Sequence, residues 1–402
     1  MSVFSNYKKE LMDAAHNERI RLALSRAIGS YRVNASNALT KFPHTIKLAE
    51  EVREIKVRAI DDMEKLAQQA SEAIMANHGK AYIARTASEA LEIIGNLVGK
   101  SKLIVKAKSM TSEEISLREH LEAMGNEVCE TDLGEFIIQK LHSKPMHILS
   151  PAIHVPREDV ATLLSQITGE KLPPDDIARM VATARTLLRE KFIQADIGIS
   201  GANVVAADTG TLFIIENEGN ARLVTALPPI HIALVGMEKL VPTFGDANKV
   251  AEVTWRYANY TVPSYVNLIS GPSRTGDIEK IITYGAHGPK ELHVIFLDAG
   301  RTELAKHPLL CEALYCLRCG GCLYECPVFA VTAGHFGDSY FTGIGAVWAT
   351  MLSKKTEKGA AMAYTCLTCG RCKVTCPMAI DTPAMIIALR KLIAEGESTS
   401  SG

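Results

Sequence analysis

The sequence predicts an α/β domain with a mostly parallel sheet, preceded by helices and followed by a small helical domain rich in cysteine. Three observations lead to this fold class. Short β-type runs alternate with helical stretches between residues 76 and 300, which is typical of a parallel sheet covered by helices. The first 75 residues show helical periodicity. Nine of the ten cysteines lie between Cys311 and Cys376.

The composition is that of a globular protein. The 402 residues suffice for two or three domains, at roughly 150 residues per domain. A net charge of −1 argues against nucleic acid or an anionic membrane as the main partner, because proteins that bind either usually carry an excess of basic residues. No run approaches the ~20 apolar residues that span a bilayer, and the start lacks a signal-peptide core. We therefore expect a cytoplasmic protein, with membrane association through partners as an open alternative.

Residues 1–75 are predicted to form an N-terminal helical segment. Over Leu48–Ala73, apolar side chains recur at steps of three and four on one helix face. That face consists of Leu48, Val52, Ile55, Ala59, Met63 and Leu66. Charged residues of both signs fill the other face, so we expect a docking helix without a catalytic role.

Residues 76–300 are predicted to form the α/β domain. Helices are expected over Ser88–Val98 and Thr111–Met124, and glycines and prolines punctuate the connections. The predicted strands are Ala81–Ala84, Leu103–Lys106, Ile148–Ser150, Ile197–Ser200, Leu212–Ile215, His231–Val235 and His293–Leu297.

Residues 301–395 are predicted to form the cysteine-rich helical domain. Helices are expected over Gly343–Leu352 and Thr382–Leu392, with Asp381 or Thr382 capping the latter and Pro383 in its first turn. Residues 396–402 are polar and small, and we expect a disordered tail.

Two cysteine runs share one spacing. The first runs from Cys316 to Pro327 and the second from Cys366 to Pro377. Both read C-x₂-C-x₂-C-x₃-C-P, which is the bacterial ferredoxin pattern for [4Fe–4S] clusters. The isolated Cys129 and Cys311 are expected to be ordinary buried thiols.

In two-cluster ferredoxins the fourth cysteine of each run ligates the other cluster. We therefore predict two [4Fe–4S] clusters and a domain that unfolds on losing iron. Zinc sites and purely structural clusters are the alternatives. The predicted ligands are Cys316, Cys319, Cys322 and Cys376 for cluster 1, and Cys366, Cys369, Cys372 and Cys326 for cluster 2.

The α/β region carries a family resemblance. The segments Asp196–Asn203, Asp208–Leu212, Asn217–Arg222, Leu227–His231, Lys106–Met110, Glu130–Glu135, Pro151–His154 and Gly271–Arg274 resemble the LUD (lactate-utilisation) domain. Followed by a double ferredoxin run, the chain resembles lactate-utilisation iron–sulfur proteins of the B type over roughly residues 40 to 380. The resemblance implies an α/β fold of the sugar-phosphate isomerase and CoA-transferase type. It also implies a subunit of a system that oxidises L-lactate to pyruvate, with a second LUD protein and a cysteine-rich iron–sulfur subunit as partners.

A site for a carboxylate or phosphate is predicted in the α/β domain. The loop Asp208-Thr209-Gly210-Thr211 offers N–H groups and hydroxyls, and Arg222 could clamp a carboxylate. Lys106 and Lys108 lie at the end of a predicted strand, with Ser109 next to them, and α/β folds tend to bind ligands at this place. The alternatives are a tight turn for the glycine and a solvated surface for the cations. His154, His231 and His335 are conceivable proton carriers or structural donors.

The leading functional hypothesis is an electron-transfer subunit of an oxidoreductase complex acting on lactate or a related 2-hydroxy acid. No G-x-G-x-x-G fingerprint opens a helix, so a flavin or other two-electron centre is expected on a partner subunit. The chain ends about 25 residues beyond Pro377, which motivates a second hypothesis. In it, the LUD domain is a non-catalytic scaffold within a heterodisulfide-reductase-like or quinone-reducing assembly. The third hypothesis is a stand-alone isomerase or transferase.

Partners are expected to dock near Gly334–Trp348, which is rich in apolar and aromatic residues. The alternative is that these residues only cover the clusters.

Overall fold

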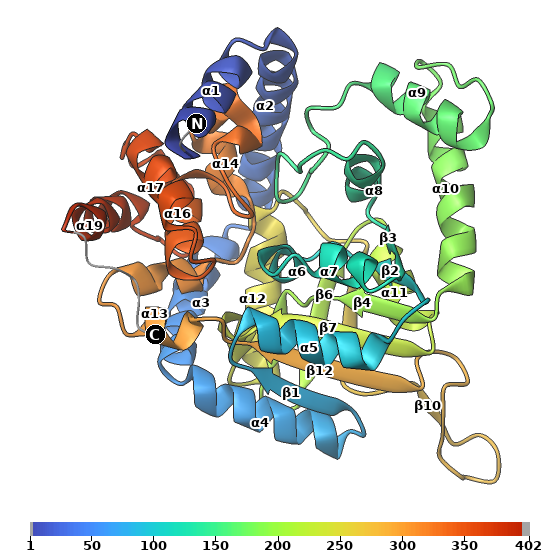
Figure 1. Cartoon of the computed structure of the whole chain (residues 1–402). Helices are drawn as coiled ribbons and strands as arrows, with labels where there is room; N and C mark the ends of the chain where they lie inside the picture. Colours follow the sequence, from blue (N-terminus) through green and yellow to red (C-terminus); the bar gives the residue numbers. More distant parts are fainter. Residues whose placement is uncertain (1–2, 396–402) are drawn as a thin grey trace.

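The computed structural model describes residues 3–395, and the predicted disordered tail at residues 396–402 lies outside this range. Its central element is a six-stranded sheet in the order β1-β12-β7-β4-β2-β3, in which all neighbours are parallel (Figure 1). The strands are β1 (Lys80–Ala84), β2 (Leu103–Lys106), β3 (Glu127–Glu130), β4 (Ile197–Ser200), β7 (Ile230–Gly236) and β12 (Glu291–Leu297). The predicted mostly parallel sheet is confirmed.

A second, mixed sheet has the order β8-β5-β6-β9. It comprises β5 (Val204–Ala206), β6 (Thr211–Glu216), β8 (Leu240–Val241) and β9 (Tyr265–Ile269), while β10 (Arg274–Thr275) and β11 (Thr283–Tyr284) form a separate hairpin. Six of the seven predicted strands are present. The strand predicted at Ile148–Ser150 is wrong, because the His147 Nδ1 accepts the N–H groups of Leu149 and Ser150 and curls this segment into a turn.

Helices cover the faces of the main sheet. The helix predicted over Thr111–Met124 is broken at Ser116, whose φ is 51°, into α6 and α7. The helices of this region are α5 (Ala87–Val98), α6 (Met110–Glu114), α7 (Leu117–Ala123), α8 (Leu133–Lys140), α9 (Arg157–Thr168), α10 (Ile177–Gln194), α11 (Asn220–Ala226) and α12 (Phe244–Tyr257).

The N-terminal helices divide between the other two regions. Helices α1 (Val3–Ala15) and α2 (Glu18–Lys41) pack against the cysteine-rich domain, beside the C-terminal helices in Figure 1. Helices α3 (His44–Asp61) and α4 (Met63–Ala76) pack against the α/β domain. The predicted apolar face of this pair is buried, apart from the partly buried Leu48.

The cysteine-rich domain is helical, as predicted. Asp381 caps α19 by accepting the Ala384 N–H, with a proline at the helix start. The helices are α13 (Arg301–Ala305), α14 (Gly321–Glu325), α15 (Phe329–Thr332), α16 (Thr342–Met351), α17 (Thr356–Thr365), α18 (Arg371–Thr375) and α19 (Thr382–Ala394). Short 3₁₀ turns occur at Met237–Lys239, Leu310–Tyr315 and Ala333–His335.

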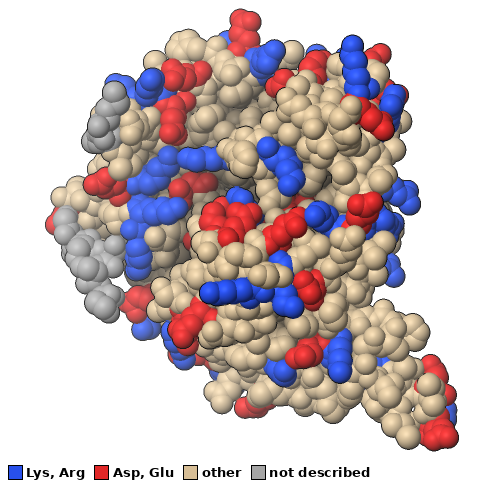
Figure 2. Space-filling model, turned by 45° about the vertical axis from the view of Figure 1, so that its right-hand side comes forward, with Lys and Arg blue, Asp and Glu red and all other residues tan. Residues whose placement is uncertain are grey.

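One hydrophobic core joins the sheet to the cysteine-rich domain. It runs from Val294 and Phe296 in β12 to Trp348 in α16 and Met385 in α19. Acidic and basic side chains are interspersed on the face shown in Figure 2. Within residues 3–395, none of the helices combines the length and the apolar character needed to cross a bilayer.

Candidate metal centres and the adjoining cavity

The two cysteine runs adopt the same backbone conformation. Arg318 and Gly320 have φ of 62° and 78°, and the equivalent Thr368 and Gly370 have 51° and 78°. This left-handed region suits glycine, which has no Cβ to clash. A five-residue helix follows each turn, α14 in the first run and α18 in the second, and the two helices are in contact.

The two runs divide their eight cysteines between two cavities. The first cysteine cavity is lined by Cys316, Cys319, Cys322 and Cys376, and the second by Cys326, Cys366 and Cys369. Cys372 lines both. All ten cysteines of the chain are free thiols. This grouping agrees with the crossed ligand sets, although the assignment of ligands to iron stays a prediction.

The donor chemistry of the cavities suits iron–sulfur clusters. Soft thiolate ligands select such clusters among the possible metals. Burial raises the pKa of Cys319 to about 12 and those of Cys326 and Cys376 to about 11, so these thiols are protonated without metal and must lose protons on binding iron. Among residues 3–395, no three His, Cys, Asp or Glu side chains form a group suited to a single metal ion.

A buried charge network adjoins the first cysteine cavity, which it reaches through Arg318. The Glu238 carboxylate accepts from the Arg301 Nε and, at 2.8 Å, from the Arg318 guanidinium. The Lys56 ammonium donates to the Glu238 carbonyl. Burial alone would raise the pKa of Glu238, yet Arg301 and Arg318 hold it well below its usual range. Burial lowers the pKa of Lys56 to about 8 and that of its neighbour Lys239 to about 7.

This network carries surplus positive charge. Its buried cations are Lys56, Lys239, Arg301 and Arg318, and its buried anions are Glu114 and Glu238. Near neutral pH, Lys56, Arg301 and Arg318 exceed the two anions by about one positive charge, and Lys239 with its pKa of about 7 adds a partial charge. A [4Fe–4S]²⁺ core with four thiolates carries a net charge of about −2. The residues around the first cysteine cavity thus fit such a cluster in charge as well as in ligand type.

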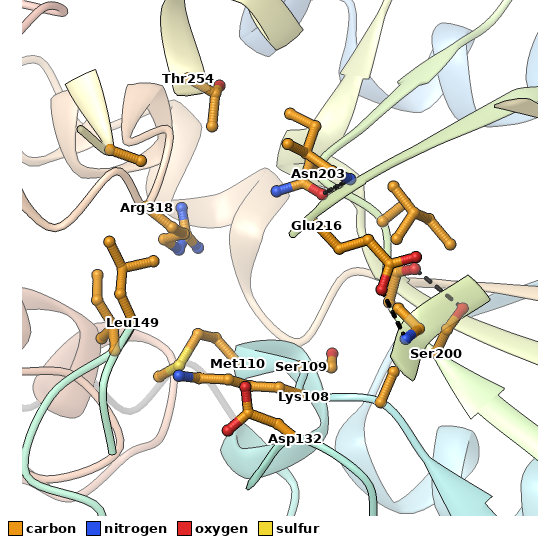
Figure 3. A pocket seen from close by; sticks show the side chains of 18 of the residues that line it. Lys108, Ser109, Met110, Asp132, Leu149, Ser200, Asn203, Glu216, Thr254 and Arg318 are labelled. Carbon is orange, nitrogen blue, oxygen red and sulfur yellow. Dashed lines mark hydrogen bonds between the residues drawn. The ribbon is translucent and has the colours of Figure 1, made fainter. Parts of the chain in front are cut away.

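A larger cavity of about 250 Å³ adjoins the first cysteine cavity, and we call it the strand-end cavity. Lys108 and Ser109 enter it just after β2, and Ser200 enters it at the end of β4 (Figure 3). The carboxyl ends of parallel strands are where open α/β sheets bind ligands. Arg318 and Tyr340 line both this cavity and the first cysteine cavity, so only their side chains and near neighbours separate the two.

Several donors in the strand-end cavity lack acceptors. The Lys108 Nζ and the Trp255 Nε1 are buried without a hydrogen-bond partner among the described residues. Lys239 also lines the cavity and forms no ion pair within residues 3–395. Sequence reasoning identified Lys108 but missed Lys239 and Arg318. Lys239 follows β7, and this position after a parallel strand could have indicated a ligand-binding residue. Arg318 lies between two cysteines of the first run, where nothing in the sequence indicates a role in the cavity.

The remaining predicted anion-binding residues lie elsewhere. The Lys106 Nζ forms buried ion pairs with Glu130 at 2.9 Å and Glu113 at 3.0 Å. Arg222 stacks on the Tyr265 ring, 5.2 Å from its centroid.

The predicted glycine loop packs against the N-terminal helices. Gly210 lies so close to Ile74 in α4 that a Cβ would be 2.7 Å from the Ile74 side chain. The Asp208 carboxylate accepts the Phe244 N–H, and the Thr211 hydroxyl bonds to that of Thr209. Neither the loop Asp208–Thr211 nor Arg222 lines the strand-end cavity.

Of the histidines considered as proton carriers, His231 is buried and forms a hydrogen bond with the Ser200 hydroxyl at 2.8 Å. Burial lowers the pKa of His231 to about 3, which keeps the ring neutral.

The predicted docking surface at Gly334–Trp348 is wrong, because its apolar side chains are core residues. Phe336, Tyr340, Phe341, Ile344, Val347 and Trp348 are all buried.

Comparisons with known proteins agree with this architecture. A family model described as the LUD domain matches residues 67–297, and one described as a 4Fe-4S dicluster domain matches residues 312–380. Lactate utilization protein B of Bacillus licheniformis is 34% identical over 97% of this chain and 81% of its own length. The protein of that name from Bacillus subtilis is 33% identical over 97% of this chain and 80% of its own length.

A crystal structure of a DUF162 family protein from Deinococcus radiodurans is also similar, with a TM-score of 0.32 and 14% identity. The similarity covers 58% of this chain and 98% of the Deinococcus chain. The identity to the Bacillus proteins extends over nearly the whole chain. The chain therefore belongs to the LUD-domain iron–sulfur family whose curated members are named Lactate utilization protein B.

Proposed function

We propose that this chain is the iron–sulfur electron-transfer subunit of a multi-subunit oxidoreductase. The complex oxidises L-lactate or a related 2-hydroxy acid to the 2-oxo acid. The observation that carries the proposal is the division of eight free cysteines between two adjacent cavities. The name of the relatives, Lactate utilization protein B, supports the choice of substrate.

The two clusters would supply one-electron transfer between neighbouring sites. Cys316, Cys319, Cys322 and Cys376 would hold cluster 1, and Cys366, Cys369, Cys372 and Cys326 would hold cluster 2. Arg318 holds the first turn in place through its contacts with Glu238 and with the Cys316 carbonyl at 2.7 Å. Oxidation of a 2-hydroxy acid removes two electrons, so a flavin or other two-electron centre on a partner subunit completes the system. The proposed partners are a second LUD protein and a cysteine-rich iron–sulfur subunit.

Anaerobic reconstitution of the purified chain tests the proposal. We expect about eight iron atoms per chain and electron paramagnetic resonance signals of two interacting [4Fe–4S] clusters after reduction with dithionite. With the partner subunits present, L-lactate should reduce the same clusters. A chain that binds zinc or no iron would contradict the proposal. Clusters that dithionite reduces, but that lactate never reduces in the assembled complex, would favour the scaffold alternative.

A further inference from the structure

We propose that the strand-end cavity binds a small carboxylate with a second oxygen next to the carboxyl group, held by Lys108 and Lys239. This inference rests on the proposed function and places the substrate site of that function within this chain. The site lies between the end of the parallel sheet and the turn that carries Cys316 and Cys319.

Two buried lysines without ion-pair partners point to a negatively charged ligand. The Lys108 Nζ is fully shielded from solvent and has no partner among the described residues. Lys239 is 8% exposed, and neither lysine forms an ion pair within 4.0 Å in residues 3–395. An unpaired buried charge is costly, so such a pair is retained where a ligand supplies the counter-charge. Burial lowers the pKa of Lys108, and an anion beside it would raise that pKa again.

Asp132, Glu135, Glu218 and Glu113 act on Lys108 at a distance and raise its pKa, but none of them forms an ion pair or a hydrogen bond with its ammonium among the described residues. The Glu216 carboxylate accepts from the Ala221 and Arg222 N–H groups and from the Asn267 side chain. Asp132 caps α8 by accepting the Glu135 N–H at 3.0 Å. The third carboxyl group, Glu218, has its pKa raised by burial and by Asp132 against the opposing effect of Lys108, and it forms no ion pair with either lysine among the described residues. In the view of Figure 3, the Lys108 side chain extends away from Glu216, passes the Asp132 side chain and ends beside Met110.

Other donors in the cavity suit a second oxygen on the ligand. The Trp255 Nε1 is buried without an acceptor among the described residues. The Asn203 side chain accepts the Ile215 N–H through its Oδ1 at 2.9 Å, and its Nδ2 has no partner within residues 3–395. A carboxylate alone would leave these donors unsatisfied, whereas an adjacent hydroxyl or carbonyl oxygen could accept from them.

The size and place of the cavity narrow the ligand class. About 250 Å³ is less than the ~300–1,000 Å³ typical of sites for drug-sized ligands, so a molecule of few heavy atoms fits. Ile148, Leu149 and Ile215 add apolar lining for a short carbon chain. Because Arg318 and Tyr340 line both cavities, a ligand here lies beside cluster 1 and farther from cluster 2.

Anaerobic calorimetry on the iron-loaded chain tests the site with L-lactate, pyruvate and inorganic phosphate as separate probes. We expect L-lactate or pyruvate to bind once per chain, and Lys108→Met and Lys239→Met each to weaken that binding at least tenfold. The matched control is Lys191→Met, whose lysine forms an exposed ion pair with Glu127. Preferential binding of phosphate, no binding of either carboxylate, or wild-type affinity in both variants would overturn the proposal.

Two further readouts distinguish a ligand site from a structural role. Because Lys108 is unpaired, Lys108→Met should leave the melting temperature unchanged or raise it, whereas loss of a structural contact would lower it. A bound carboxylate should also shift the paramagnetic resonance signal of cluster 1 and leave that of cluster 2 unchanged.

Iron content is measured on the same samples, so the two proposals fail separately. An iron-loaded chain that binds no carboxylate refutes the cavity assignment alone. A chain without iron refutes the proposed function.

Discussion

Replacing Glu238 with glutamine should strongly destabilise the iron-loaded protein. The substitution keeps the side-chain volume and removes the only carboxylate that contacts Arg318 among the described residues. Glu238 is fully buried, and its partner Arg301 keeps a second contact, to Glu114 at 2.6 Å. Breaking a buried pair by removing one partner costs about 3–5 kcal/mol, because an uncompensated charge stays behind. The retained Glu114 contact places our expectation near the lower limit, about 3 kcal/mol.

Urea denaturation under anaerobic conditions measures this loss. Glu303→Gln is the matched control, because its exposed pair with Lys306, 3.0 Å apart, should contribute less than about 1 kcal/mol. Removing a negative charge beside cluster 1 should also raise its reduction potential, since the reduced cluster is the more negative state. If Glu238→Gln costs no more than Glu303→Gln, the buried network does not stabilise the domain junction and the argument from its charges is wrong.

Three further predictions concern single sites. Gly343→Ala should lower the iron content at cluster 2, because the added methyl would lie 3.1 Å from the Cys366 sulfur; an unchanged iron-to-protein ratio would contradict this. His231 has a depressed pKa of about 3, so its stabilising contribution is present above pH 6.5 and lost as the pH falls. We expect His231 to contribute about 2 kcal/mol to the stability lost between pH 7 and pH 5 in denaturation experiments, and His231→Gln should reduce the loss by that amount while the similar contribution of His147 stays. Cys311→Ala should keep both clusters by iron analysis, since Cys311 lines neither cysteine cavity.

Features encoded locally could be predicted from the sequence. The cysteine spacing fixes each turn within seven residues, from Cys316 to Cys322 and from Cys366 to Cys372. The strand β4 is a continuous run of apolar and small residues, and β2 is an apolar run that ends at Lys106, so the bounds of both agree with the prediction. The resemblance to the LUD domain allowed the fold of the whole α/β domain to be predicted, and the match of the family model to residues 67–297 confirms this prediction.

Features that depend on distant contacts could not be predicted. Arg318 meets Glu238 across 80 positions, and Arg301 meets Glu114 across 187. No local pattern indicates such pairings. An aromatic run such as Gly334–Trp348 reads equally well as surface or as core, and only tertiary packing decides. The segment Ile148–Ser150 is apolar enough for a strand, but the N–H groups of Leu149 and Ser150 donate to the His147 Nδ1 and not to a neighbouring strand.

Iron analysis of two double variants tests the crossed ligand sets most directly. Cys319→Ala with Cys376→Ala removes two predicted ligands of the same cluster, although the residues come from different runs. We expect about four iron atoms per chain to remain in this variant. Cys369→Ala with Cys376→Ala removes one predicted ligand from each cluster and should leave almost no iron. The reverse result, with iron retained only in the Cys369→Ala and Cys376→Ala variant, would show that each run holds its own cluster and would contradict the account.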